Sequence, residues 1–492
     1  MGGLKIGRKE LLQVLNDAER RFPVNTWRIG EIYVWPIIKI DLFFRHVKVE
    51  NHQKDFVENT QVRKPSFLNS IFQVLYSLLS YWVLVLSSHL FKTKVNVLFS
   101  DSFGHRVWLK DKYINRYFEP LITEFIKEDN NFKSITLNDD LADQDKYPSS
   151  ERIFFTSNYI RGAKLVGHLF RRHPKQYLPD FDDFVGLFDK DEFYYLKVNK
   201  YKDWLVARCL HVVSLERIVR AFLRKYEPNV IFELCYYSSL RFAINLASRK
   251  KGIKTIEMQH GGMGHEHVSY ANWSNVPELG FNVLPNTFWV WDDASGKLLN
   301  SWIEKKGNHS VIVGGNPWLG YVDACDDTKY EFIEGKTIIL YTMQYREIEE
   351  YILDAIALSP EAYQWWVRLH PRKTDAKFQI ESKLKEMGIA NKVEITKATE
   401  YPLPIILKKS AVHLSGSSGS IIEAAQLGVP SLILTKLGAD YYQSIIQSGR
   451  AFPVLEKSSQ VLLSKICDIE RKVEPKDDMI VNLRAALNNV LR

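Results

Sequence analysis

The stretch that most constrains the fold lies within residues 412–435. An apolar run is followed there by six small residues, SGSSGS at 415–420. The next segment, IIEAA at 421–425, predicts a short helix, which Gly428 and Pro430 end before a second apolar run, SLIL. Because uninterrupted apolar runs are typical of strands buried on both faces, we predict a parallel strand, a turn, a helix and a further parallel strand.

A turn of this kind is predicted to bind a phosphate group. The first backbone N–H groups of a helix have no partner within the helix, and they lie at the positive end of its dipole. Four serine hydroxyls stand beside them in this sequence. An anion is the ligand that such a helix start favours. The residues predicted to form the phosphate site are Ser415, Gly416, Ser417, Ser418, Gly419, Ser420 and Glu423.

A basic motif lies about forty residues upstream. Residues 362–369 (AYQWWVRL) predict a strand, and the proline that follows it favours an extended backbone at the residue before it. Ligands of open parallel sheets bind at the carboxyl ends of the strands, so we expect this motif and the serine turn to meet at one phosphate-bearing ligand. The motif consists of His370, Pro371, Arg372 and Lys373.

The predicted catalytic residues, Glu233 and His260, lie in the first half of the chain. Glu233 is the one carboxylate in the apolar strand 229–234, and His260 follows the next strand, 253–258. Both residues are therefore expected at the same edge of one sheet. Burial raises the pKa of a carboxyl group unless it is paired, and an imidazole is the partner we expect. Glu233 is predicted to act at the reacting centre, as a base or as a nucleophile.

The turns after two strands are predicted to approach the sugar. Glycines after His260 allow the backbone to come close to a ligand. A second turn, GGNP at 314–317, follows another short strand. The residues predicted on this side of the site are Gln259, Gly261, Gly262 and Asn316.

The alternation of strands and helices from residue 95 onwards predicts an α/β fold, and 492 residues suit two domains with substantial cores. A polar stretch near residue 330 indicates the linker between them. The predicted divisions are a helical and aromatic N-terminal extension at 1–94, a first domain at 95–322, a linker at 323–335 and a second domain at 336–492.

Residues 66–91 contain no Asp, Glu, Lys or Arg. The segment is long enough to span a bilayer, but its six serines dilute its apolar character. Basic residues precede and follow it, as interfacial anchors do. Three alternatives stay open: a buried or crevice-covering helix, a helix lying in the plane of a membrane, and a membrane span.

Composition excludes several classes of protein. The net charge of +8 comes from dispersed lysines and arginines, so no basic block favours nucleic acid. The four cysteines form no CxxC pair, which argues against a cysteine zinc site, and His265 and His267 lack further ligands at a metal-site spacing. We expect no metal and no cofactor. The N-terminus has no apolar run after its charges, so we expect a cytoplasmic protein, peripheral at the inner membrane if residues 66–91 bind lipid.

The strand followed by His370-Pro371, together with the serine turn, helix and GVP strand, resembles the nucleotide-binding half of GT-B fold glycosyltransferases. The pair of motifs is most similar to transferases that use CMP-activated Kdo or sialic acid in bacterial capsule and O-antigen assembly, and to the CDP-alditol phosphotransferases of teichoic-acid assembly. The resemblance implies two Rossmann-like domains that face each other across a cleft, with a C-terminal helix at 479–492 packed back on the first domain. It also implies that His370 and the four serines contact the nucleotide phosphate.

The activity that the resemblance implies is transfer of a sugar, Kdo or a related acidic sugar from a CMP donor, to a surface polysaccharide or a lipid-linked acceptor. A CDP-glycerol or CDP-ribitol phosphotransferase, with His260 as the base, is one alternative. A transferase that uses a UDP- or GDP-activated sugar is another. A non-catalytic protein that keeps the shell of the fold to bind nucleotide or glycan is the alternative from outside the enzymes.

Overall fold

Two sheets, each with only parallel pairings, form the centre of the molecule. The computed structural model describes residues 6–52, 67–109, 112–138, 147–148, 151–169, 174–198, 200–304, 308–324, 329–371, 373–470 and 483–491. The first sheet has the order β12 (Ser310–Val313), β11 (Thr287–Val290), β10 (Lys254–Met258), β9 (Val230–Glu233), β3 (Val97–Asp101), β6 (Ser134–Asn138) and β7 (Ile153–Phe155). The second has the order β15 (Val393–Glu394), β14 (Tyr363–Arg368), β13 (Thr337–Thr342), β16 (Ser410–Ser415), β17 (Ser431–Ile433) and β18 (Ala451–Pro453).

Both sheets grow outward from their first strand. The chain moves from β3 to β6 on one side and later returns to add β9 on the other, and in the second sheet it places β14 and β16 on opposite sides of β13. The point where the strand order reverses leaves a crevice at the carboxyl ends of the strands, where ligands of doubly wound sheets bind. Two such crevices are therefore built into the fold, at β3/β9 and at β13/β16.

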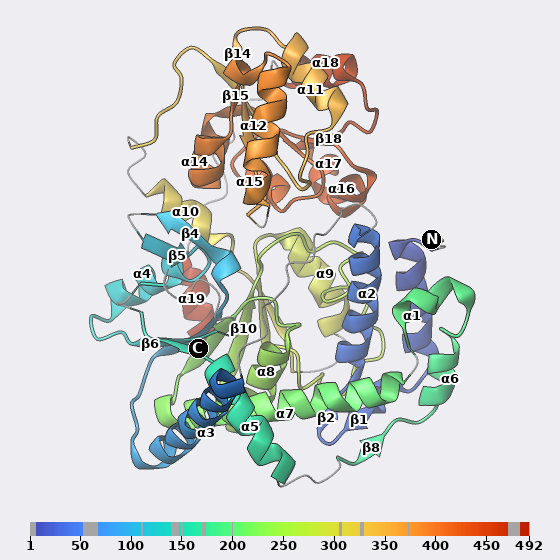
Figure 1. The fold of residues 1–492 in the computed structure, drawn as a ribbon, viewed down its shortest axis with the longest axis vertical. Helices are drawn as coiled ribbons and strands as arrows, with labels where there is room; N and C mark the ends of the chain where they lie inside the picture. The colour runs from blue at the N-terminus through green and yellow to red at the C-terminus, as the bar shows by residue number, and fades with distance from the viewer. Residues whose placement is uncertain are drawn as a thin grey trace.

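Helices cover the sheets, and the two Rossmann-like domains face each other, as Figure 1 shows with the first domain below and the second above. The predicted fold class is confirmed. The helices of the first domain include α4 (Glu119–Glu128), α7 (Tyr201–Tyr226), α8 (Ser239–Lys251) and α9 (Asp293–Ile303), and α10 (Pro317–Asp323) follows β12. The helices of the second are α11 (Glu350–Leu358), α12 (Lys377–Glu386), α13 (Thr396–Glu400), α14 (Leu403–Lys409), α15 (Ser420–Gln426), α16 (Lys436–Tyr441), α17 (Gln443–Gln447) and α18 (Ser459–Glu470).

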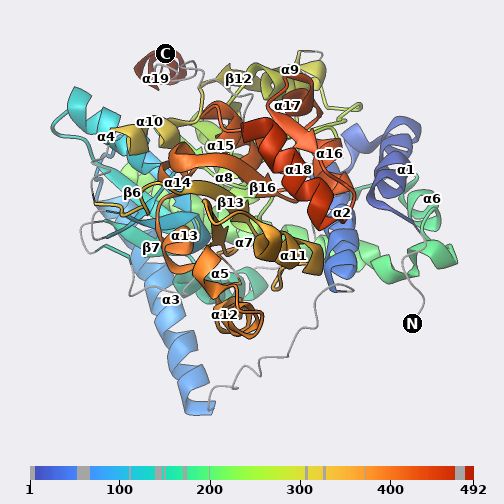
Figure 2. The same ribbon diagram turned by 90° about the horizontal axis from the view of Figure 1, so that it is seen from above.

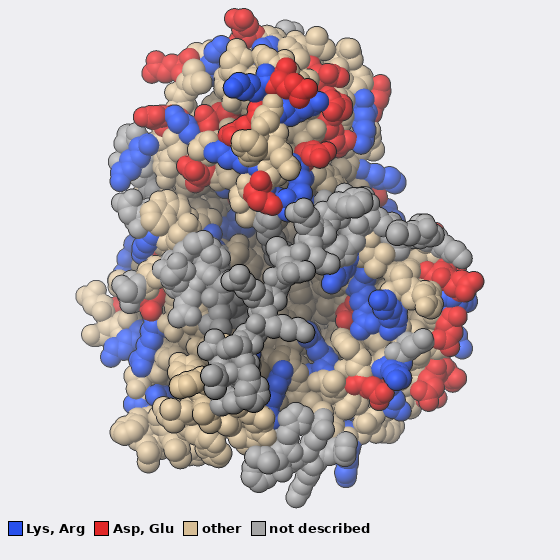
Figure 3. Space-filling view, viewed as in Figure 1, with Lys and Arg blue, Asp and Glu red and all other residues tan. Residues whose placement is uncertain are grey.

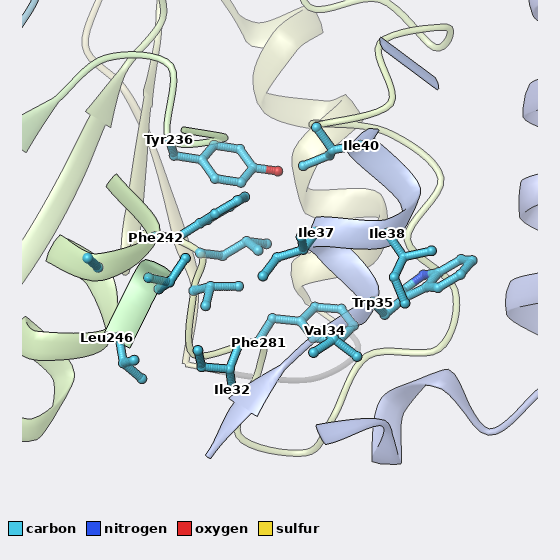
Figure 4. Packing of buried hydrophobic residues seen from close by; sticks show 14 of the residues in the cluster. Ile32, Val34, Trp35, Ile37, Ile38, Ile40, Tyr236, Phe242, Leu246 and Phe281 are labelled. Atoms are coloured by element: carbon cyan, nitrogen blue, oxygen red, sulfur yellow. The ribbon is translucent and has the colours of Figure 1, made fainter. Parts of the chain in front are cut away.

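The N-terminal helices α1 (Arg8–Arg21) and α2 (Trp35–His52) share the core of the first domain. Pro36 stands in the first turn of α2, where a proline costs the helix no hydrogen bond. Figure 4 shows Ile37 and Ile40 of α2 facing Phe242 and Tyr236, which belong to the region of α8. The N-terminal helical extension is thus joined to the first domain by continuous apolar packing.

A buried ion pair fastens this extension. Lys39 of α2 and Glu19 of α1 are both fully buried, with Nζ 2.6 Å from Oε2. Lys39 also donates to the carbonyl oxygen of Asn272, and its ammonium lies over the ring of Trp273. Glu19 accepts from the backbone N–H of Ser274. Each charge is therefore compensated in the apolar interior, which is the condition under which buried charges are tolerated.

A long apolar helix, α3 (Phe67–Leu90), packs on α5 (Ser157–Leu169) and α7. Gly162 of α5 lets the two helices approach closely, since a Cβ at this position would lie 2.5 Å from the carbonyl oxygen of Ser77. Residues Phe72–Leu90 are, among the described helices, the one segment long and apolar enough to cross a membrane by length and composition.

Three regions differ from the sequence predictions. The alternating pattern from residue 95 predicts a helix over 113–127, but α4 begins only at Glu119, because the residues before it form the hairpin β4 (Arg106–Leu109) and β5 (Lys112–Asn115). Residues 138–200 are polar and aromatic, and the sequence predicts there an insertion with one short strand at 152–155. The structure has that strand as β7 and adds α5 and α6 (Phe181–Gly186). A small antiparallel sheet joins β1 (Arg28–Ile29), β2 (Ile32–Tyr33) and β8 (Gln176–Tyr177).

The C-terminal helix α19 (Leu483–Leu491) packs back on the first domain, as predicted. Ala486 and Leu487 lie in one apolar cluster with Phe125 of α4, and Arg484 pairs with Glu128. The second domain is therefore tied to the first at a place far along the chain from the linker.

We expect Lys39→Met to lower the free energy of unfolding by about 3–5 kcal/mol, because it leaves the buried Glu19 carboxylate without its cation. Lys39→Met combined with Glu19→Gln should be less destabilised than Lys39→Met alone, since the orphaned charge is then removed. Lys457→Met, at an exposed pair with Glu349, is the control and should change stability by less than about 1 kcal/mol. Chemical denaturation measures all three, and a single variant no worse than the double would contradict the role of the pair.

Candidate active site between the two sheets

The two glycine-containing turns predicted from the sequence meet across the domains. A Cβ at Gly419 of the serine turn would lie 3.3 Å from the Cα of Gly261, in the turn after β10. A Cβ at Gly262 would lie 3.0 Å from the hydroxyl of Tyr442, which itself donates to the carbonyl oxygen of Ser417. Backbone thus packs directly on backbone where the carboxyl edges of the two sheets face each other.

The crevice of the first sheet is lined by titratable and polar side chains. His260 Nε2 lies 3.1 Å from the thiol of Cys235 and 3.1 Å from the hydroxyl of Tyr237. His105, in the turn after β3, lies 3.8 Å from the same thiol through Nε2 and 3.0 Å from the hydroxyl of Ser102 through Nδ1. His105 and Cys235 come from the loops after β3 and β9, the two strands between which the sheet order reverses.

The surroundings of His260 keep its imidazole neutral near neutral pH. Burial lowers the pKa of His260, and the nearby Glu257 opposes that effect. Its backbone oxygen accepts a hydrogen bond from the hydroxyl of Tyr117, which in turn accepts one from Arg116. The imidazole is therefore held in place from the backbone side and keeps a basic nitrogen available near neutral pH.

Glu233 lies deeper than the sequence predicted. It is fully buried, and its Oε1 accepts a hydrogen bond of 2.8 Å from Asn245 of α8. The interpretation that paired it with an imidazole is wrong, because the side chain lies on the face of the sheet that α8 covers. Strand alternation alone could not decide between the two faces. Burial raises the pKa of Glu233 to about 8.

Glu257 is the register partner of Glu233 on the neighbouring strand, so both carboxyl groups lie on one face of the sheet. Glu257 is also fully buried; it accepts 2.6 Å from the hydroxyl of Tyr270 and 3.3 Å from the backbone N–H of Tyr236. Burial, with a contribution from the charge of Glu233, raises the pKa of Glu257 to about 8. The face of the first sheet that α8 covers thus holds two acids that are mostly protonated at neutral pH.

In the second sheet, residues at the end of β13 hold the serine turn. Gln344 accepts from the backbone N–H of Ser417 at 2.6 Å, across the crevice between β13 and β16. Thr342 contacts the hydroxyl of Ser420 at 3.0 Å, and the hydroxyl of Ser415 donates to the carbonyl oxygen of Thr342. Gly416 leaves room for Gln344, since a Cβ there would lie 2.4 Å from its Oε1. The other two serine hydroxyls also have partners inside the domain: Ser417 accepts from the side-chain amide of Gln344 at 3.2 Å, and Ser418 accepts from the backbone N–H of Ser420 at 3.3 Å. Ser417 and Ser418 are half-buried, whereas Ser415 and Ser420 are buried.

The basic motif follows β14, the neighbour of β13. His370 is half-buried there, and its carbonyl oxygen accepts from the backbone N–H of Lys373. The ammonium of Lys373 lies 5.8 Å from the ring centroid of Tyr345. Pro371 is exposed, and Arg372 lies outside the described residues. The motif and the serine turn flank the same strand end, on opposite sides of β13.

Glu423 of α15 links the domains electrostatically. It is buried, and its Oε1 lies 3.9 Å from Nη1 of Arg116 in the first domain. Burial raises the pKa of Glu423, while Arg116 and Arg368 act in the opposite direction. Arg368, at the end of β14, donates to two backbone carbonyl groups. The second carboxylate oxygen of Glu423, Oε2, has no hydrogen-bond partner among the described residues, so it is left for a ligand or for water.

The two polar residues predicted on the sugar side, Gln259 and Asn316, make hydrogen bonds to the backbone. Gln259 is fully buried; its Oε1 accepts from the backbone N–H of Trp291 and its amide donates to the carbonyl oxygen of Gly261. Asn316 caps α10, accepting from the backbone N–H of Trp318. Gln259 therefore fixes the glycine turn from below.

Sequence reasoning missed His105, Cys235, Tyr237, Thr342 and Gln344. Each follows or ends a strand at one of the two reversals in strand order, which the linear sequence does not display. A lone cysteine or glutamine after a strand carries no spacing pattern. The strand order of a Rossmann-like sheet would have identified them, because it places the residues after the first strand of each half beside the ligand.

Among the residues that the structure describes, no three His, Cys, Asp or Glu side chains are grouped so as to hold a metal ion. His265 and His267 lie in the loop after β10, as the sequence indicated.

Comparison with known proteins supports the fold. No family model matches the sequence, and no curated protein matches it significantly. A solved structure from Listeria monocytogenes, assigned as a UDP-N-acetylglucosamine 2-epimerase, is similar over 81% of this chain and 95% of its own, with a TM-score of 0.50 and 13% identity. The UDP-GlcNAc 2-epimerase of Methanocaldococcus jannaschii gives 0.48, with 13% identity over 81% of this chain and all of its own. The spinosyn rhamnosyltransferase SpnG gives 0.43, with 10% identity over 81% and 95%.

We base the assignment on the Listeria structure, since the lower scores support no argument. The chain has the GT-B type of two-domain α/β fold. About a fifth of it has no counterpart in that structure.

The two buried acids predict a pH dependence of stability. Both have a pKa of about 8 in the fold against an ordinary 4.5, so the stability that they contribute is complete below about pH 4.5 and is lost as the pH rises through 8. We expect the free energy of unfolding to fall across this range by a few kcal/mol, an order of magnitude set by about 1.4 kcal/mol per pKa unit.

Glu233→Gln and Glu257→Gln should each flatten that decline, because glutamine mimics the protonated acid and does not ionise. Glu31→Gln, at a half-exposed carboxylate, is the control and should leave the slope unchanged. Chemical denaturation at a series of pH values measures the slopes. Equal slopes for the wild type and both buried-site variants would contradict the assignment of protonated acids.

Proposed function

We propose that the protein is an enzyme that acts on a nucleotide-activated sugar, and that the reaction is glycosyl transfer. The observation that carries the proposal is the meeting of the His260 turn with the serine turn, Gly261 against Gly419, at the facing edges of a GT-B fold. Such a reaction needs a binding site for the departing nucleotide, a proton acceptor beside the reacting carbon or hydroxyl, and exclusion of water. The second domain is suited to bind the nucleotide, the first domain to accept the proton, and the contact between the domains to exclude water.

His260 is the residue that we propose at the reacting centre. Its neutral imidazole can accept a proton from an acceptor hydroxyl, and Cys235 and Tyr237 orient its Nε2. The burial of Glu233 behind the sheet, bonded to Asn245, moves that residue to a supporting role: a protonated acid that adds no negative charge beside the site.

The nucleotide is proposed to lie along the carboxyl ends of β13, β14 and β16. His370, Lys373 and the half-buried Ser417 and Ser418 would meet its phosphate groups, and the free carboxylate oxygen of Glu423 would accept from a hydroxyl. A CMP-activated acidic sugar is the donor that the sequence resemblance suggests. CDP-, UDP- and GDP-linked donors fit the same contacts, because none of these residues reads the base.

Epimerisation of the sugar while it stays linked to the nucleotide is the second candidate. The Listeria structure, assigned as an epimerase, shares the fold over 95% of its own length. Transfer is preferred, because the strand-HP and serine-turn motifs of the sequence resemble those of glycosyltransferases. Release of free nucleotide in the presence of an acceptor indicates transfer, whereas an altered sugar on an intact nucleotide indicates epimerisation.

Removal of the basic motif should weaken nucleotide binding. We expect His370→Ala to lower the affinity for the nucleotide about tenfold or more, the effect of losing a charge-assisted phosphate contact. His89→Ala, on α3, is the control and should bind as the wild type does. Calorimetry with CMP, CDP, UDP and GDP gives the affinities and identifies the base. Equal affinity for the wild type and His370→Ala, with both folded, would remove this motif from the site.

Removal of the imidazole should stop turnover without loss of the fold. We expect His260→Ala to lower kcat by at least about a hundredfold, the scale of a positioned general base, with nucleotide affinity and melting temperature near those of the wild type. The acidic limb of the wild-type rate should lie below pH 6.5, because burial lowers the pKa of His260 and the base form persists to lower pH. His265→Ala, exposed in the same loop, is the matched control.

The measurement is nucleotide release from a panel of CMP-, CDP-, UDP- and GDP-activated sugars. Near wild-type turnover by folded His260→Ala would contradict the role of the imidazole.

A further inference from the structure

The outer face of α3 is apolar and exposed along its described length. The exposed side chains recur at the spacing of one helical face and are Phe72, Leu75, Tyr76, Leu79, Trp82, Val83, Leu86 and Leu90. Phe72 is 76% exposed and Leu79 65%. Figure 2 shows α3 projecting beyond the rest of the molecule, and Figure 3 shows mostly tan side chains over its place at the lower left.

This face is larger than the apolar patches of ordinary soluble monomers. At about 200 Å² for a fully exposed large apolar side chain, the eight residues leave on the order of 1,000 Å² in water. The largest patch on a typical monomer is about 300–600 Å². Patches beyond that size are found where a protein meets another protein or a membrane.

The exposed face is separate from the face that holds α3 on the domain. The opposite side of the helix buries Ser77, Tyr81, Leu84 and Ser88 against α5 and α7. The close crossing at Gly162 and the hydrogen bond from Lys225 to Ser87 fix the helix there. A helix held along its length in this way presents its outer face sideways, which suits a surface and does not suit a span.

The charges around this face are mostly positive. The sequences of α3 and α5 contain no Asp or Glu. Arg161 and Lys164 of α5 are exposed beside it, and Lys94 is exposed beyond its end. At this end of the helix Glu227 pairs with Lys92 and also interacts with Lys94, so one carboxylate faces two lysines and the net charge stays positive. Trp82 and Tyr76 add the aromatic rings that favour the boundary between lipid and water.

We propose that α3, with the basic residues of α5 and of the segment after α3, binds the surface of an anionic lipid bilayer with the helix axis in the membrane plane. The apolar face enters the boundary between head groups and acyl chains, and the cations meet the negative head groups. The complementary charge is what favours a lipid surface over a second copy of this chain, whose identical face carries the same positive charge. The inference does not depend on the proposed function, since it concerns none of the residues proposed to bind or convert the nucleotide sugar.

Sedimentation with lipid vesicles tests the proposal on the full chain. The wild type should bind vesicles of phosphatidylcholine with about one quarter phosphatidylglycerol at low salt, and should bind pure phosphatidylcholine, or anionic vesicles at about 1 M salt, much more weakly. The triple variant Leu75→Ser, Leu79→Ser, Leu86→Ser should lose at least tenfold in partition. The matched control, Leu358→Ser, Phe378→Ser, Leu455→Ser, removes three equally exposed apolar side chains of the second domain and should bind as the wild type does.

Two further measurements identify the occupant of the face. Brominated lipid should quench tryptophan fluorescence of the wild type, and Trp82→Phe should remove most of that quenching while the protein still sediments with vesicles. Light scattering without lipid should show a monomer. Three results would each overturn the proposal. The first is failure of the wild type to bind anionic vesicles, and the second is equal binding by the wild type and the α3 triple variant. The third is a wild-type dimer that is lost in the α3 triple variant and kept in the matched control.

Discussion

The structure depends on the close approach of two turns from different domains. Gly261 and Gly419 face each other with no side chain between them, so the carboxyl edges of two independent parallel sheets come together at one place. A methyl group at Gly419 would require a neighbour to move by a few tenths of an ångström, although the backbone conformation of this residue would accept any amino acid. The glycine is therefore needed for the contact between domains and not for its own turn.

This contact brings together the points in the two sheets where the strand order reverses. Each sheet starts in its middle, so the loops after β3 and β9, and those after β13 and β16, diverge and leave a crevice. The first crevice holds imidazoles and a thiol, with two neutral acids on the sheet face that α8 covers, and the second holds a serine turn bonded to Gln344. Titratable groups thus lie on one side, and the serine turn that we propose to bind phosphate lies on the other. A nucleotide-activated sugar is a molecule with these two halves, which is why the fold and the site support one proposal.

Much of this layout could be predicted from sequence because buried parallel strands are apolar at nearly every position. The run at 229–234 predicted β9 to within a residue, and the run at 253–258 did the same for β10. The face of a strand could not be predicted in the same way, and Glu233 was placed at the cleft when it lies behind the sheet against Asn245. The end of β5 was assigned to a helix, because the helix predicted over 113–127 includes residues 113–115 of that strand. Cys235 and Gln344 were not predicted as site residues, because only the strand order shows that they lie at the carboxyl ends of the central strands.

The central claim is that one ligand is held by the His260 turn and the serine turn together. Hydrogen–deuterium exchange of the full chain, with and without the nucleotide-activated sugar that calorimetry shows to bind, tests it most directly. The account predicts that amides of residues 260–264 and of residues 416–420 are both slowed by the same ligand at the same concentration. Protection confined to one of these turns, or located away from both while the ligand is bound, would contradict it.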